Sequence, residues 1–141
     1  MKVLIDTNIV LDLLLEREPF VEDAIALFDQ VEAGQVRGYI AATTITNIFY
    51  IVRKAQGREA ALQSVSRIAA GLEICAVDRP TIAQALASNL KDFEDGIQFA
   101  CAVLNQLDAI AIRDTSDFTG VSLPVWSIAE LQAQLSQQNA E

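Results

Sequence analysis

The sequence contains no histidine and only two cysteines, Cys75 and Cys101. The absence of histidine excludes Ser-His and Cys-His catalysis as well as zinc bound by histidine. The two cysteines lack the close spacing of a metal site, so we expect buried free thiols in a reducing cytosol. No apolar run approaches the roughly 18 uncharged residues that a membrane span needs, and Asp6 comes too early for the apolar core of a signal peptide. We therefore predict a cytoplasmic protein that does not bind a membrane.

Basic residues are also scarce. Lysine and arginine total 10 against 19 aspartates and glutamates, which leaves a net charge of −9. Proteins that bind nucleic acid usually carry a basic face, because contacts with phosphates dominate their affinity, so this balance argues against a general DNA-binding module. It does not exclude an enzyme whose carboxylates hold a divalent cation, because the metal supplies positive charge locally. It would also suit docking to a basic segment of a partner.

Short apolar segments alternate with segments of helical spacing along the whole chain. The 141 residues, of which 52% are hydrophobic, predict a single domain over residues 1–141. The alternation predicts an α/β fold with a parallel or mostly parallel sheet and helices on both sides. The strands are expected at 2–5, 37–41, 72–77, 108–113 and within 123–127. The helices are expected at 8–16, 19–34, 43–57, 58–71, 78–88, 92–107 and 127–138.

Local signals predict where several of these helices begin. Pro19 is expected to begin the helix 19–34, with Phe20 on its apolar face. Thr43 or Thr44 is expected to cap the helix 43–57, and Asp78 or Arg79 the helix 78–88. Ser127 and Glu130 have the spacing of a capping box at the start of the last helix.

Acidic residues follow two of the predicted strands and open one helix. Asp6 ends the first strand, Asp114 and Asp117 follow the strand 108–113, and "DFED" from Asp92 to Asp95 opens the helix 92–107. Each has an ordinary explanation as a helix cap or a turn residue. Together they point to a site, because functional residues in parallel α/β sheets gather at the carboxyl ends of the strands.

Three carboxylates at such an edge would repel one another unless a cation neutralised them or they retained protons. Oxygen ligands without histidine or cysteine indicate Mg²⁺ or Mn²⁺. Such a metal can activate water and stabilise the transition state of phosphodiester hydrolysis. The acids therefore predict a metal-dependent hydrolase.

Three segments resemble the motifs of one known family. "VLIDTNIVLDLL", "DFEDGIQFACA" and "AIAIRDTSDF" are similar, in order and spacing, to the first, third and fourth motifs of PIN domains, above all of small bacterial VapC-like toxins. The resemblance covers nearly the whole chain. It implies a Rossmann-like parallel sheet flanked by helices on both sides and a metal-dependent endoribonuclease that uses Mg²⁺ or Mn²⁺. It also implies an RNA substrate, an antitoxin protein as partner, and a homodimer.

The resemblance assigns roles to residues by their positions in these motifs. Asp95 is preferred to Asp92, because the family pattern places the acid directly before small and apolar helical residues. Thr7 or Asn8 would position a carboxylate or a phosphate. Apart from the resemblance, Arg113 is a basic residue beside the proposed site and is a candidate to contact RNA phosphates. The predicted catalytic and metal-binding residues are Asp6, Asp95 and Asp114, with Asp117 as a further metal ligand.

One motif departs from the family pattern. The family has a glutamate early in the helix after the second strand, where this chain has Asn47. An amide oxygen can coordinate a hard cation but brings no charge, so we expect weaker metal binding. Asp12, Asp92 and Glu94 are candidates to replace the missing acid.

Asn47 also supports an alternative function, a non-catalytic or weakly active module that binds RNA or protein. A phosphoaspartate protein is disfavoured, because Asn8 stands where a phosphatase of the haloacid-dehalogenase type needs a second aspartate. A response-regulator receiver would need an acid pair near the first strand and a lysine after the last strand, and neither is found.

Overall fold

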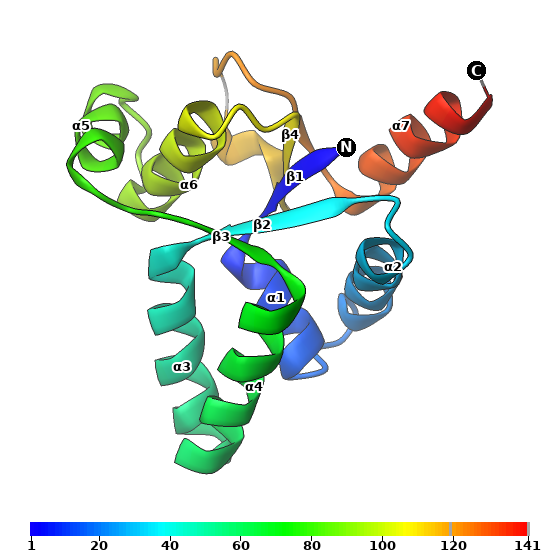
Figure 1. Ribbon diagram of the computed structural model, residues 1–141, viewed down its shortest axis with the longest axis vertical. Helices are drawn as coiled ribbons and strands as arrows, with labels where there is room; N and C mark the ends of the chain where they lie inside the picture. Colours follow the sequence, from blue (N-terminus) through cyan, green and yellow to red (C-terminus); the bar gives the residue numbers. More distant parts are fainter. Residues whose placement is uncertain (119, 141) are drawn as a thin grey trace.

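The computed structural model describes residues 1–118 and 120–140, with the side chain of Asp117 left out. Its strands form one parallel sheet in the order β3-β2-β1-β4-β5 (Figure 1). In the centre, Leu4 of β1 lies opposite Tyr39 of β2 and Ile110 of β4. The predicted parallel α/β fold is thus confirmed. The strands are β1 (Lys2–Ile5), β2 (Arg37–Ala41), β3 (Glu73–Cys75), β4 (Ala109–Ala111) and β5 (Val125–Trp126).

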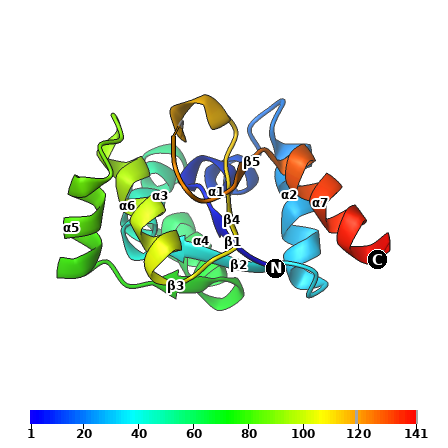
Figure 2. The same ribbon diagram turned by 90° about the horizontal axis from the view of Figure 1, so that it is seen from above.

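Helices cover both faces of the sheet, as the apolar strands predicted. Val3 and Ile5 of β1 belong to a core shared with α1, α2, α3, α4 and α7, whereas Leu4 belongs to a core shared with α5 and α6. In Figure 1, α5 and α6 lie above the sheet and α1, α3 and α4 lie below it, and Figure 2 shows α5 and α7 at opposite ends of the molecule. The helices are α1 (Thr7–Leu14), α2 (Val21–Glu32), α3 (Ala42–Gln56), α4 (Arg58–Gly71), α5 (Arg79–Ala87), α6 (Phe93–Leu104) and α7 (Ile128–Ala140), and η1 (Thr115–Phe118) is a short 3-10 helix.

Most helix boundaries follow from the local signals. The carboxylate of Asp78 accepts hydrogen bonds from the backbone N–H (3.4 Å) and the hydroxyl (2.9 Å) of Thr81 and so caps α5. Ser127 and Glu130 form the predicted capping box, with reciprocal hydrogen bonds of 3.1 and 3.2 Å. These predictions are confirmed because capping depends on residues only a few positions apart.

Two predicted helix starts are wrong. Helix α3 begins at Ala42, directly after β2, and its N-cap residue Ala41 makes no side-chain hydrogen bond. Thr44 lies inside the helix and is buried instead. Helix α2 begins at Val21, so Pro19 precedes it, and Phe20 is 37% exposed rather than part of the apolar face. Thr44 is buried and Phe20 is exposed because of contacts in the folded protein, which the local sequence signals for helix starts do not contain.

The order of the strands creates one place where a site can form. From β1 the chain adds β2 and then β3 on one side, and it crosses to the other side of β1 to add β4 and β5. The strand order therefore reverses between β1 and β4. In open α/β sheets the crevice outside the carboxyl ends of such strands is where ligands bind.

Two further sequence expectations concern the thiols and the apolar runs. Cys75 and Cys101 are both buried and free, as predicted. Among the residues that the structure describes, no helix is long and apolar enough to cross a bilayer.

Candidate functional site

Asp6 lies at the carboxyl end of β1, and only 5% of its surface is exposed. Its Oδ2 accepts a 3.0 Å hydrogen bond from the backbone N–H of Asn8, which makes Asp6 the N-cap of α1. The capping role does not exclude a second one, because Asp6 also lines a cleft. Burial raises the pKa of Asp6 above its ordinary value, and hydrogen bonds from Gln98 and Asn8, with the charge of Arg113, oppose that rise.

Gln98 is a residue of this site that sequence reasoning missed. It lies on α6, is 1% exposed, and donates a 2.8 Å hydrogen bond from Nε2 to Oδ1 of Asp6. Its Oε1 accepts a 3.3 Å hydrogen bond from the backbone N–H of Thr7. Because a donor stabilises the ionised form of a carboxylate, Gln98 counteracts part of the effect of burial on Asp6. The available signal was a polar residue inside the apolar run "IQFACAV".

The first turn of α6 contributes three acids to the same cleft. Asp92 is the N-cap of α6, and its Oδ1 accepts a 3.0 Å hydrogen bond from the backbone N–H of Asp95. Asp92 and Glu94 are exposed, whereas Asp95 is half-buried. All three line the cleft, so the preference for Asp95 as the ligand stays a prediction.

The segment after β4 contributes Arg113 and Asp114. A 2.6 Å hydrogen bond from the hydroxyl of Ser116 and a 3.0 Å bond from its backbone N–H reach Oδ1 of Asp114 and lower the pKa of that carboxyl. Asp114 is therefore held in its ionised form more firmly than Asp6. The side chain of Asp117, the predicted further metal ligand, lies outside the described residues.

The cleft joins these three parts of the chain in a hollow of about 450 Å³ at the carboxyl ends of β1 and β4. Among the residues that the structure describes, five carboxylates line it, together with one asparagine and one arginine. Its location agrees with the point where the strand order reverses. The lining residues within the described part of the chain are Asp6, Asn8, Phe20, Asp92, Glu94, Asp95, Ile112, Arg113 and Asp114.

The donor atoms of the cleft fit a hard divalent cation. Carboxylate and amide oxygens are the ligands that Mg²⁺ and Mn²⁺ prefer, and no softer donor is among the described lining residues. Within residues 1–118 and 120–140, apart from the side chain of Asp117, no three acidic, cysteine or histidine side chains are grouped closely enough to hold a metal ion. The donor type therefore fits, and the acids would have to draw together around a cation.

Helix α3 contacts α1 next to the site through a pair of threonine hydroxyls. The hydroxyls of Thr7 and Thr44, which are 5% and 1% exposed, lie 3.0 Å apart. Thr7 does not line the cleft, and it is held beside Asp6 by this contact and by the hydrogen bond from its backbone N–H to Gln98. Asn47, one turn after Thr44, is half-buried and is not among the described lining residues.

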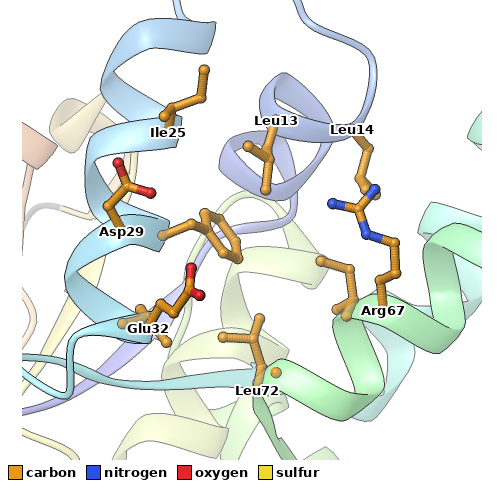
Figure 3. A pocket seen from close by; sticks show the side chains of 11 residues that line it. Leu13, Leu14, Ile25, Asp29, Glu32, Arg67 and Leu72 are labelled. Atoms are coloured by element: carbon orange, nitrogen blue, oxygen red, sulfur yellow. The ribbon is translucent and has the colours of Figure 1, made fainter.

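A second hollow of about 370 Å³ lies between α1, α2 and α4, and the described residues that line it are all different from those that line the acidic cleft. Figure 3 shows Asp29 and Glu32 on the α2 wall and Arg67 on the α4 wall. Apolar side chains line the groove between these charges, including Leu13, Leu14, Phe28, Ile68 and Leu72.

Comparisons with known proteins identify a family and a set of similar folds. The family model described as the PIN domain matches residues 2–116 of this chain. No curated protein gives a significant match.

Several solved structures have the same fold at low sequence identity. DNA-bound VapBC from Salmonella typhimurium matches with a TM-score of 0.71 and 16% identity, over 91% of this chain and 98% of that one. A toxin–antitoxin complex from Klebsiella pneumoniae matches with a TM-score of 0.67 and 23% identity, over 89% and 97%. VapC20 from Mycobacterium tuberculosis, described as a toxin that cleaves the sarcin–ricin loop, matches with a TM-score of 0.65 and 13% identity, over 82% and 92%.

Proposed function

Because this chain belongs to the PIN domain family, we propose that it is the toxin of a toxin–antitoxin pair and a metal-dependent endoribonuclease. The observation that carries the proposal is the cleft at the strand switch point, where acids that follow β1 and β4 and acids at the start of α6 line one hollow. Similar folds in proteins described as VapBC or as toxin–antitoxin complexes support the same class.

Asp6, Asp95 and Asp114 would hold Mg²⁺ or Mn²⁺, with Asp117 as a further ligand. When bound, the cation supplies positive charge and promotes ionisation of water for attack on a phosphodiester. Gln98 and the N–H of Asn8 hold both oxygens of Asp6 in a fixed orientation. Loss of its proton is opposed by burial, so metal binding and the deprotonation of Asp6 are coupled.

RNA is the proposed substrate class. The similar fold described as a sarcin–ricin loop cleaving toxin supports RNA over DNA. The cleft carries mostly negative charge, so Arg113 would contact the RNA backbone and a bound cation would strengthen that binding.

The groove of Figure 3 suits an antitoxin segment. An amphipathic helix could place its apolar stripe against Leu14 and Phe28, basic residues against Asp29 and Glu32, and an acid against Arg67. The net charge of −9 favours such a basic partner. A homodimer is also proposed, and sedimentation equilibrium of the purified chain would test it.

A non-catalytic module that binds RNA or protein is the second candidate. The observation that favours it is the neutral Asn47 at the position of the family glutamate, together with the spread of the described acids. It predicts RNA binding without cleavage under any metal condition.

One experiment separates the two candidates. A mixed pool of structured RNAs is incubated with the purified, antitoxin-free protein in Mg²⁺, Mn²⁺ or EDTA, beside the Asp6→Asn variant. Metal-dependent cleavage that Asp6→Asn lacks is the result expected of a nuclease. Equal products from the folded wild type and the variant would instead favour the binding module.

A further inference from the structure

Asp12 on α1 is a carboxylate buried between two arginines, with 1% of its surface exposed. Its Oδ1 accepts a 2.9 Å hydrogen bond from Nε of Arg17. Its Oδ2 lies 3.1 Å from Nε of Arg113. Because both oxygens face cations and Asp12 does not line the acidic cleft, Asp12 is badly placed to replace the missing acid as a metal ligand.

Arg113 is fixed on two sides by these surroundings. Its Nε edge faces Asp12, and its Cζ lies 4.1 Å from the centre of the Phe20 ring, so the ring covers one face of the guanidinium. Its closest contact with Asp12 is made through Nε and not through either of the two terminal amino groups. These two groups form the part of the guanidinium fork that matches a phosphate.

The exposure of Phe20 has a reason in this arrangement. The ring is 37% exposed and lines the cleft, so burial of the ring alone does not explain its position. Stacking against a guanidinium is favourable and orients the planar group. Of the described residues that line the cleft, Arg113 alone is cationic.

We infer that Asp12 and Phe20 are positioning residues that hold the Arg113 guanidinium at the cleft so that its terminal amino groups bind a backbone phosphate of RNA. The inference rests on the proposed function for the identity of the ligand. Bidentate binding of a phosphate depends on the orientation of the guanidinium plane, which the carboxylate on one edge and the ring on one face together determine.

The test measures binding of a fluorescently labelled pool of structured RNAs in EDTA over a range of salt concentrations. Arg113→Gln should bind about tenfold more weakly, as expected for loss of a charged hydrogen bond. The logarithm of the association constant falls linearly with the logarithm of the salt concentration. For Arg113→Gln this slope should be less steep by about 0.7, the value for one phosphate contact on a single strand. Arg113→Lys keeps the charge, so it should keep the slope while losing affinity.

Arg17→Gln is the matched control, because it removes the same charge from the same carboxylate. Arg17 does not line the cleft, so its loss should leave the salt slope unchanged. Equal slopes for wild type and Arg113→Gln, or wild-type RNA binding without salt dependence, would overturn the inference.

A double-mutant cycle tests the role of Asp12. Asp12→Asn should weaken RNA binding in the wild type and have no further effect in Arg113→Gln, because its contribution passes through Arg113. Phe20→Leu should likewise weaken RNA binding in the wild type and have no further effect in Arg113→Gln. It leaves no buried charge unpaired, so it replaces Asp12→Asn in the cycle if that variant does not fold. Additive losses of affinity would show that Asp12 and Phe20 act independently of Arg113.

Metal binding separates this inference from the proposed nuclease activity. Mn²⁺ titration by calorimetry should give the same affinity for Asp12→Asn as for wild type, whereas a large loss would identify Asp12 as a ligand and overturn its positioning role. RNA binding in EDTA needs no turnover. A wild type that binds RNA and never cleaves it would therefore refute the nuclease while the binding cycle still decides the role of Asp12.

Discussion

The hydrogen bond from Gln98 to Asp6 should make the stability of this protein depend on pH in a defined way. We consider Gln98→Met, which keeps the length of the side chain and removes both polar atoms. The variant leaves the backbone N–H of Thr7 without its buried acceptor, at a cost of about 1–3 kcal/mol. At pH 7 it also removes a hydrogen bond to an ionised carboxylate, about 1.5–3 kcal/mol. We expect a total destabilisation of about 3–5 kcal/mol at pH 7.

The pH dependence follows from the raised pKa of Asp6. A group whose pKa is higher in the folded state contributes stability that is complete below the unfolded value of 3.8 and is lost as pH rises through the folded value. Removing Gln98 raises the folded pKa further, so more stability is lost by pH 7. Below pH 3.8 Asp6 is protonated in both proteins, and the difference between them should shrink to about 2 kcal/mol.

The assay is urea unfolding of wild type and Gln98→Met between pH 3 and pH 8, with the linear extrapolation to water. The matched control repeats the comparison in an Asp6→Asn background, where position 6 has no carboxylate to titrate. There the effect of Gln98→Met should no longer vary with pH. If Gln98→Met lowers the stability of the protein that keeps Asp6 by the same amount at every pH, the reasoning that Gln98 stabilises this carboxylate is refuted.

Three other predictions concern separate parts of the molecule. Ser116→Ala removes the 2.6 Å hydrogen bond to Asp114 and should raise the pKa of that carboxyl toward its ordinary value, which an NMR titration would detect. Asn47→Glu adds a charge on the face of α3 that carries Thr44, so it should raise the Mn²⁺ affinity about tenfold. Asn47→Gln adds no charge and should leave the affinity unchanged. Equal Mn²⁺ affinities of the two variants in calorimetry would contradict this prediction. Ser127→Ala should cost about 1 kcal/mol in chemical unfolding through loss of the α7 cap, and Ser127→Asp should restore it.

The sequence by itself determined the elements of this fold and most of their boundaries. Strand 2–5 and strand 37–41 were predicted at their observed ends, because a short apolar run bounded by polar residues is a local signal. The caps at Asp78, Asp92 and Ser127 were equally local, since each joins residues three positions apart. The alternation of strands and helices also implied a parallel sheet, and hence a site at the carboxyl ends of its strands.

Only the tertiary structure decided which side chains meet at that edge. Gln98 and Asp6 are 92 positions apart, and they pair because α6 packs beside β1. Arg113 meets Asp12 and Phe20 because β4 joins β1 directly, out of sequence order. Hydrophobic periodicity indicates which face of an element is buried, but it contains no information about strand order. Contacts between distant element ends, and the pKa values they set, therefore arise only once the sheet is assembled.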